Sequence, residues 1–498
     1  MRCFRFACIG LLALGIVSCR NSLPLGSGTV TVDLSAPRQS IDGFGGSNAW
    51  TGLPGDSATS AKVVQLLFSK TNGIGLTILR NRIPFREQQG NGSTIPNWDD
   101  KFINHSTGNN YQYATNANGT KTFSLKWDNW DLAQTKALIS AVKALGSDAD
   151  SLTLFSTPWT PPNNSTTNWK TGVPDASNYP QVGGSLDPAH YADYADVLAD
   201  YANGFTANMG IALGALSIQN EPNFTCNYES CSWNSSQIQN FLDAMQQEFQ
   251  KKGVSSSLSV LAPEDMNFKE DLILPSLSDA VAGAFLSIVG VHQYDRNASD
   301  FAARWLPTVK SAGKRLWMTE VSDTSANDGS IADGIYLARM VHADMTTAEV
   351  NAFCYWWLWT GSGDTSTASL VNLNTAKPSG SQVLDNKRLY ALGQFSRFVR
   401  PGWVRLQAES DPTSQVEASV YRNPGSKEVA VVLINYGSTG DSVQLGLSGA
   451  SSFASLKQWR TSATEELAPL GALGVSASSA TVALPAQSIT TVYGTVNS

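Results

Sequence analysis

Short apolar runs alternate with longer amphipathic stretches along the chain from about residue 40 to 400. The longer stretches repeat apolar residues at helical spacing, as in residues 189–208, 237–251 and 331–345. Because the short runs are apolar at consecutive positions, they predict parallel strands that are buried on both faces. The predicted strands span residues 41–45, 76–80, 152–156, 213–219, 258–262, 288–292, 316–320 and 352–356.

Eight strand–helix units of this kind predict an α/β fold, a (β/α)₈ TIM barrel over residues 41–400. A doubly wound open sheet is the alternative, but it would usually carry a Gly-rich phosphate-binding turn, which the sequence lacks. Residues 86–128 are rich in Asn and Gly and follow the second strand, so we expect a long insertion at the carboxyl ends of the strands.

The pattern changes after Pro401. Residues 404–498 alternate apolar and polar positions between turn clusters, which predicts a C-terminal β-sandwich side domain. Residues 28–34 alternate in the same way ahead of the first barrel strand. We therefore expect residues 28–40 to add an N-terminal strand to the side domain, so that both ends of the folded chain meet there.

Composition narrows the class of protein. The chain has 498 residues, of which 42% are hydrophobic and only 15% are charged, and it holds 14 Trp and 14 Tyr. This length allows a barrel plus a smaller domain, and the low charge favours an extracellular protein. The net charge of −7 without a basic patch excludes nucleic acid as a partner. We expect a monomer.

The N-terminus is typical of an export signal, because Arg2 and Arg5 precede an apolar stretch at residues 6–17. Residues 16–19 (Ile-Val-Ser-Cys) resemble the bacterial lipoprotein box, in which Cys19 becomes the lipid-bearing first residue. An ordinary signal peptide is the alternative. With Arg20 next, the box resembles that of a lipoprotein sorted to the outer membrane. We predict an exported protein, either secreted or held at the cell envelope, with membrane contact only through this lipid.

The remaining cysteines fit an exported chain. Cys226 and Cys231 flank a short loop, and an oxidising compartment would allow them to form a disulfide. Cys354 lies in an apolar run and is predicted to be an inert buried thiol. The four histidines are scattered along the sequence, so we predict no metal site, and no cofactor is indicated.

Two glutamates are the strongest candidates for chemistry. Glu221 closes the apolar run at 216–221, and Glu320 closes the run at 316–320. The carboxyl ends of parallel barrel strands meet at one rim, where such folds build active sites. Two carboxylates at this rim indicate the pair that cleaves glycosidic bonds. The alternative is that each is a solvated charge at a strand end.

Five segments of the chain carry a resemblance to a known family: residues 42–46 (DGFGG), 157–162 (TPWTPP), 219–222 (QNEP), 318–320 (MTE) and 397–402 (RFVRPG). They occur in the order found in glycoside hydrolase family 30, a clan A family of retaining β-glycosidases, which the chain resembles from about residue 28 to 495. The resemblance implies that Glu221 is the general acid/base and Glu320 the nucleophile. It also implies that Asn220 bonds the sugar 2-hydroxyl, and it places Arg80 either beside the nucleophile or in a structural ion pair.

Aromatic residues after the third, sixth and eighth strands suit a sugar site, although core packing is the alternative for each. Trp356 and Trp357 are adjacent on one strand and should point in opposite directions, so we expect only Trp357 to face the cleft. His292 is either a polar contact to the sugar or a structural histidine. The predicted aromatic contacts are Trp159, Tyr294, Trp357 and Trp359.

The resemblance leaves the substrate open. The glucuronoxylan-cleaving branch of the family carries an arginine after the eighth strand, whereas residues 358–364 contain no basic residue here. We therefore predict an endo-acting enzyme on a plant or microbial cell-wall β-glycan, xylan first, with β-1,6-galactan and β-1,6-glucan as alternatives. Lys101, Lys121 or Lys126 could supply the missing cation. A non-catalytic glycan-binding lipoprotein would be expected to lack a glutamate, and both are present.

Overall fold

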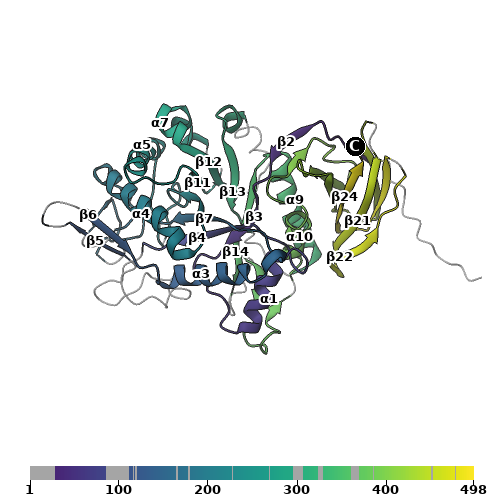
Figure 1. Ribbon diagram of the computed structural model, residues 1–498, viewed down its shortest axis with the longest axis horizontal. Helices are drawn as coiled ribbons and strands as arrows, with labels where there is room; N and C mark the ends of the chain where they lie inside the picture. Colours follow the sequence, from purple (N-terminus) through teal and green to yellow (C-terminus); the bar gives the residue numbers. More distant parts are fainter. Residues whose placement is uncertain are drawn as a thin grey trace, which may run out of the picture.

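The structure is a computed structural model that has a barrel at one end and a β-sandwich at the other (Figure 1). Helices α9 (Ile331–Thr346) and α10 (Lys387–Ser396) lie between the two (Figure 1). The residues described are 28–85, 111–115, 117, 121–163, 167–177, 180–226, 228–267, 270–294, 307–322, 329–360, 369–384, 386–449, 452–476 and 478–497.

Eight parallel strands form the closed barrel, which confirms the predicted fold class. Each strand pairs with the next in chain order, and the pairing of the last strand with the first and with the seventh closes the ring. Every strand overlaps one of the predicted runs. They are β3 (Gly43–Ser47), β4 (Ile78–Ile83), β7 (Thr153–Pro158), β10 (Leu213–Ser217), β11 (Ser259–Asp265), β12 (Leu286–His292), β13 (Arg315–Glu320) and β14 (Ala352–Thr360).

Helices cover the outside of the barrel. In α5 (Ser235–Lys251), Asn234 and Gln237 form a reciprocal capping box that begins the helix. The buried positions of α5 recur at helical spacing, so one apolar face packs on the strands. The other barrel helices are α1 (Ser57–Phe68), α3 (Trp130–Lys143), α4 (Tyr191–Met209), α6 (Leu274–Ser278) and α7 (Ala280–Phe285).

The lumen of the barrel is filled by side chains. Gly45 allows β3 to lie close against β4, because a Cβ at this position would stand 2.3 Å from the carbonyl oxygen of Ile78. Cys354 is fully buried in the lumen, and burial raises the pKa of its thiol to about 12, which makes it inert. The packed lumen residues are Ile78, Phe155, Ala215, Leu261, Ile288, Trp317, Ala352 and Cys354.

Two sheets make up the sandwich. The smaller sheet places β1 (Gly28–Val32) parallel to β20 (Asp441–Leu447), which also pairs with β23 (Ser479–Leu484). Apolar side chains of both sheets form one buried core between them. The larger sheet has the order β2 (Pro37–Ser40), β17 (Val404–Leu406), β18 (Val416–Arg422), β19 (Glu428–Asn435), β24 (Ser488–Asn497), β21 (Ser452–Ser462) and β22 (Glu465–Ala472).

Short strands decorate the barrel: β5 (Tyr111–Thr115) pairs with β6 (Lys121–Leu125), β8 (Lys170–Thr171) with β9 (Ser185–Leu186), and β15 (Ser369–Leu373) joins β14 to β16 (Val383–Leu384). Within the described ranges, no helix has the length and apolarity needed to cross a membrane. The predicted export signal and Cys19, and much of the predicted 86–128 insertion with Lys101, lie outside those ranges.

Candidate active site

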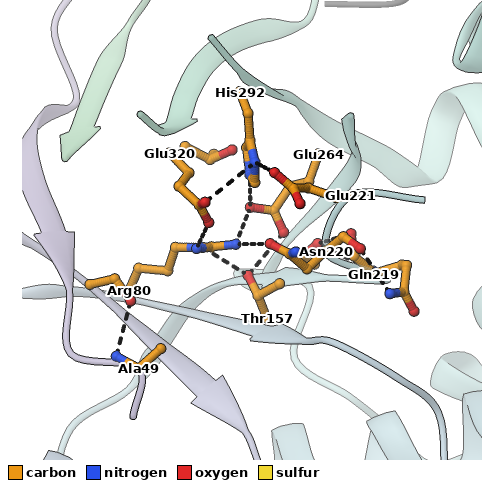
Figure 2. Close-up of polar contacts among 12 residues, drawn as sticks. Ala49, Arg80, Thr157, Gln219, Asn220, Glu221, Glu264, His292 and Glu320 are labelled. Carbon is orange, nitrogen blue, oxygen red and sulfur yellow. Dashed lines mark hydrogen bonds and ion pairs between the residues drawn. The ribbon is translucent and has the colours of Figure 1, made fainter. Parts of the chain in front are cut away.

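Polar side chains meet at the carboxyl ends of the barrel strands. Arg80 comes from β4, Glu264 from β11, His292 from β12 and Glu320 from the end of β13, while Glu221 follows β10. Figure 2 shows these side chains pointing toward one another around the guanidinium of Arg80. None is more than 5% exposed. Buried charges persist only when they are paired, so this is a connected electrostatic network.

Glu320 is held by two donors. A guanidinium nitrogen (Nη1) of Arg80 lies 2.5 Å from Oε2 of Glu320, and the hydroxyl of Tyr294 donates to Oε1 at 2.5 Å. Burial and the neighbouring negative charge raise the pKa of Tyr294 well above its usual value, so the phenol keeps its proton as a donor. The carboxylate of Glu320 is therefore fixed in one orientation.

Glu221 has a different environment. Its Oε1 lies 3.0 Å from Nδ1 of His292, and its backbone N–H donates to the carbonyl of Glu264 at 3.0 Å. Burial raises the pKa of the Glu221 carboxyl, the charge of Glu320 raises it further, and His292 opposes both effects. The surroundings thus favour a protonated Glu221 at a higher pH than an exposed glutamate would allow, as a proton donor requires.

The spacing of the two carboxyl groups fits one kind of chemistry. An oxygen of Glu221, an oxygen of Glu320 and a ring nitrogen of His292 all lie within 4.8 Å of one another. Retaining glycosidases hold their two carboxyl groups about 5–5.5 Å apart, whereas inverting enzymes need a wider gap. The arrangement therefore permits direct attack by one carboxylate while the other donates a proton.

The same three groups, Glu221, His292 and Glu320, could also ligate a metal ion. Burial alone would lower the pKa of His292, but the charges of Glu320, Glu221 and Glu264 outweigh it and raise the pKa to about 10. A histidine that holds its proton at neutral pH is a poor ligand, and Arg80 already places a positive charge beside Glu320. The electrostatics favour acid–base chemistry at this position.

The segment before Glu221 is also fixed by hydrogen bonds. The amide oxygen of Asn220 accepts from Nη2 of Arg80 at 2.7 Å, which turns its amide nitrogen away from the guanidinium. Gln219 donates from Nε2 to the carbonyl of Trp159 at 2.6 Å and to that of Asn220 at 2.8 Å. These bonds tie the turn after β10 to the turn after β7, so Asn220 presents a preorganised donor next to the two glutamates.

A cavity of about 170 Å³ opens onto the two glutamates. Trp50 and Trp159 meet edge to face with ring centroids 4.7 Å apart, and they form part of its wall. Such rings offer flat apolar faces to the C–H faces of a sugar. The lining consists of Trp50, Trp159, Glu221, Phe224, Tyr228, Met266, Tyr294, Glu320, Trp356 and Trp357.

The prediction that only one of Trp356 and Trp357 faces the cleft is wrong, because both line the cavity. Their rings stack with centroids 5.2 Å apart and planes tilted by 22°. The pairing of β14 with β3 shifts register here, so that Tyr355 and Trp357 face successive residues of β3 and Trp356 is the extra residue. A bulge of this kind breaks strand alternation and brings adjacent side chains to one side.

The structure places most of the other predicted substrate contacts at the site, but not all of them. Trp159 and Tyr294 line the cavity, while Arg80, Asn220 and His292 are buried around the two glutamates. Arg80 both contacts Glu320 and pairs with Glu264, so its two predicted roles coexist. The substrate contact predicted for Trp359 is not supported: the ring is 2% exposed, its N–H donates to the carbonyl of Gly52, and it packs into the main core outside this cavity.

Sequence reasoning missed Glu264 and Trp50. Glu264 ends the apolar run of β11, which is the same signal that identified Glu221 and Glu320, so it could have been found. Trp50 follows β3 after a short polar stretch, where no pattern distinguishes a cavity wall from the core. The other missed lining residues, Phe224, Tyr228 and Met266, lie in turns after β10 and β11.

The predicted disulfide is absent, because Cys226 and Cys231 are both free thiols. The reason lies in where each side chain points. Cys231 is fully buried in the apolar core of the barrel, whereas the thiol of Cys226 is partly exposed and donates to the carbonyl of Tyr228 at 3.7 Å. The loop beside Glu221 is held by Lys170 instead, whose buried amine donates to the carbonyl of Ser230 at 2.8 Å.

Comparison with known proteins agrees with this geometry. A glucuronoxylanase, XynC, from Bacillus subtilis is 29% identical over 474 residues, which cover 94% of this chain and 92% of the relative. An endo-β-1,6-galactanase from Hypocrea rufa is 22% identical, covering 82% of this chain and 81% of the relative. The crystal structure of a family 30 subfamily 8 xylanase from Clostridium acetobutylicum matches with a TM-score of 0.71 and 28% identity, covering 94% of this chain and 99% of that one.

The sequence profile of O-Glycosyl hydrolase family 30 matches residues 27–289, more than half of the chain. This match confirms the family that the five sequence segments indicated. It also agrees with the barrel, the side domain and the two carboxyl groups at the rim. The chain is a glycoside hydrolase and belongs to family 30.

Proposed function

We propose that the protein is a retaining endo-β-glycosidase that hydrolyses a neutral cell-wall β-glycan, xylan first, with Glu320 as nucleophile and Glu221 as general acid/base. The observation that carries this proposal is the contrast between two adjacent carboxyl groups. Glu320 is bound by the cationic Arg80 and the donor Tyr294, whereas Glu221 is buried with a raised pKa. A carboxyl group with a raised pKa beside a second one that is held by a cation is the arrangement of an acid and a nucleophile.

The first half-reaction follows from this geometry. A carboxylate oxygen of Glu320 bonds to the anomeric carbon, the bond from that carbon to the leaving oxygen breaks, and the proton of Glu221 moves to the leaving oxygen. In the second half-reaction Glu221 takes a proton from water, whose oxygen attacks the anomeric carbon and releases Glu320. Asn220, fixed by Arg80, is placed to donate to the sugar 2-hydroxyl.

Two observations support a neutral substrate. Among the described residues that line the cavity, the charged ones are Glu221 and Glu320, and the rest are aromatic apart from Met266. Lys121, one of the lysines that could have replaced the missing arginine, forms an ion pair with Asp193. A carboxylate-bearing sugar would therefore lack a cationic partner in this part of the site. The xylanase relatives favour xylan, and the endo-β-1,6-galactanase relative keeps β-1,6-glycans as the alternative.

The test is hydrolysis by the purified protein of a panel that contains several xylans, β-1,6-glucan, β-1,6-galactan and aryl β-glycosides. We expect internal cleavage of xylan, seen as a ladder of oligosaccharides and an early fall in viscosity. A 2-fluoro sugar with an activated leaving group should label Glu320, as located by peptide mass spectrometry. Labelling of a different residue would refute the mechanism, and activity confined to β-1,6-linked chains would refute the choice of xylan.

A further inference from the structure

Glu264 is a third carboxylate in the network. It is fully buried on β11 and does not line the cavity. Its Oε1 lies 3.1 Å from Nη2 of Arg80 and 3.5 Å from Nε2 of His292, while Oε2 accepts from the hydroxyl of Thr157 at 2.9 Å. It therefore contacts both cations of the site, as Figure 2 shows.

Glu264 also contacts the backbone of the acid/base residue, since its carbonyl accepts the N–H of Glu221. Both residues have left-handed backbone conformations, with φ of +56° at Glu264 and +42° at Glu221. Such conformations are uncommon outside glycine and persist where surrounding contacts fix them. The end of β11 and the segment after β10 are therefore held to each other at the rim.

The charges of the network balance in both halves of the proposed reaction. In the resting site, Arg80 and His292 are cations, Glu264 and Glu320 are anions, and Glu221 is neutral. In the glycosyl-enzyme, Glu320 is a neutral ester and Glu221 has become the anion after giving up its proton. The number of positive and negative charges is unchanged, because one negative charge has moved from Glu320 to Glu221.

His292 is placed to accommodate that movement. Its Nδ1 lies 3.0 Å from Oε1 of Glu221 and 3.8 Å from Oε1 of Glu320, while its Nε2 faces Glu264. An imidazolium donates from both ring nitrogens, whereas a neutral imidazole would turn one lone pair toward a carboxylate. Only Glu264 among its three acidic neighbours keeps a constant charge throughout the cycle.

From these contacts we propose that Glu264 is a positioning residue, the constant anion that keeps His292 protonated and Arg80 oriented while the negative charge of the site passes from Glu320 to Glu221. This inference rests on the proposed function, since it assumes that Glu320 becomes a glycosyl ester. Glu264 itself touches neither the sugar nor water in the reaction. It acts through the two cations, and its effect is greatest after Glu320 has lost its charge.

The first test is Glu264→Gln, which keeps the shape of the side chain and removes its charge. The groups facing His292 would then be Glu221, Glu320 and Tyr294, with Arg80 as the nearby cation. Loss of an anion at this distance lowers a pKa by roughly one to three units. On an activated aryl glycoside, for which hydrolysis of the glycosyl-enzyme limits the rate, the alkaline fall in kcat should begin about one to three pH units lower than in the wild type.

A matched control separates this effect from simple loss of a buried ion pair. Asp333, in the first turn of α9, is a buried carboxylate that pairs with Arg388 of α10, outside the network around Glu264. Asp333→Asn should lower the melting temperature without moving the pH profile of kcat. If the profile of Glu264→Gln overlays that of the wild type after scaling, the proposed role is wrong.

The second test needs no substitution at Glu264. The wild type is trapped with a 2-fluoro sugar, and ¹⁵N NMR of labelled histidines follows His292, whose signal is assigned with His292→Gln. The chain has only four histidines, so the spectrum is simple. We expect both ring nitrogens of His292 to stay protonated in the trapped enzyme at pH 8. A label on Glu320 with a neutral His292 would overturn this inference alone, whereas a label on another residue would overturn the proposed function as well.

Discussion

Arg80 and Arg82 lie two positions apart on β4, and each is buried between carboxylates. Arg80 pairs with Glu264 and Glu320. Arg82 pairs with Glu229, in the loop after β10, and with both oxygens of Asp131 in the first turn of α3 at 3.1 Å. Each guanidinium also lies over a tryptophan of the cavity wall, Arg80 over Trp159 at 4.7 Å and Arg82 over Trp50 at 5.0 Å.

The difference lies in what the carboxylates touch. Glu320 lines the cavity and has a second carboxyl group within reach, whereas neither Glu229 nor Asp131 lines it. The Arg82 cluster, which consists of Arg82, Glu229 and Asp131, holds a helix and a loop against the barrel, and its role is structural. Burial and ion pairing therefore do not identify a catalytic carboxylate by themselves. A catalytic carboxylate is identified by its access to the cavity and by a second carboxyl group nearby that has a different environment.

The sharpest test of this comparison is Glu320→Gln. We expect activity to fall by roughly 10⁴- to 10⁶-fold, because the variant lacks the nucleophile and cannot form the glycosyl-enzyme. The fold should persist, since Arg80 still pairs with Glu264. The measurement is the rate on an aryl glycoside, with circular dichroism as the control for folding. Substantial residual activity would remove Glu320 from the mechanism.

Glu221→Ala tests the other carboxyl group. Activity on the natural polysaccharide should fall by about 10²- to 10⁴-fold, since a poor leaving group needs the proton. An aryl glycoside with a good leaving group should be affected much less at its first step. Azide should restore part of the rate by attacking the glycosyl-enzyme. Equal slowing of both substrates without rescue by azide would contradict the acid/base role.

The Arg82 cluster should respond in the opposite way. Glu229→Gln leaves a buried guanidinium with one of its two carboxylates, and we expect the free energy of unfolding to fall by about 3 kcal/mol. Turnover on good substrates should change little, because the reacting groups stay in place. Chemical denaturation and steady-state kinetics measure the two effects. A large loss of kcat with unchanged stability would show that the two arginine clusters do not differ as we argue.

The smallest expected effect concerns the charge of the substrate. If xylan is cleaved, enzymatic removal of its glucuronate groups should change the rate little. A lost charge-assisted contact would otherwise cost about 1.5–3 kcal/mol, or roughly ten- to hundred-fold. Rates on the same xylan before and after the treatment give the answer. A collapse in activity would indicate that a cation from another segment, such as the one carrying Lys101 or Lys126, reaches the site.

The sequence predicts an element best where a single physical requirement, such as burial on both faces, determines its residues. All eight barrel strands could be predicted, because burial on both faces requires consecutive apolar residues. Their ends were less predictable: β14 runs on to Thr360 because it gains a partner in β15 beyond the barrel. The bulge at Trp356 depends on the register with β3, which no local pattern encodes.

In the site, too, some residues could be predicted from the sequence, whereas others depend on packing that no local pattern encodes. Glu221 follows β10, Glu320 ends β13 and Arg80 lies within β4, so barrel topology brings their side chains to one rim. Trp359 and Trp357 are both tryptophans in the apolar run of β14, and the sequence does not distinguish them. Trp359 nevertheless faces the core, because the direction of a side chain depends on packing. The disulfide prediction failed for a similar reason, since sequence proximity does not fix where two thiols point. The export signal with Cys19 and the domain boundaries stay predictions.

The pairing of β1 with β20 has a consequence for how the chain is made. Among the residues that the structure describes, Gly28 is the first to leave the ribosome, yet its partner in the sheet is Val443. The whole barrel is synthesised between the two. β1 therefore cannot pair with β20 until the barrel sequence has been synthesised, and the smaller sheet of the sandwich is completed after it. Contacts between segments so distant in sequence form slowly, so we expect the pairing of β1 with β20 to be among the last steps of folding.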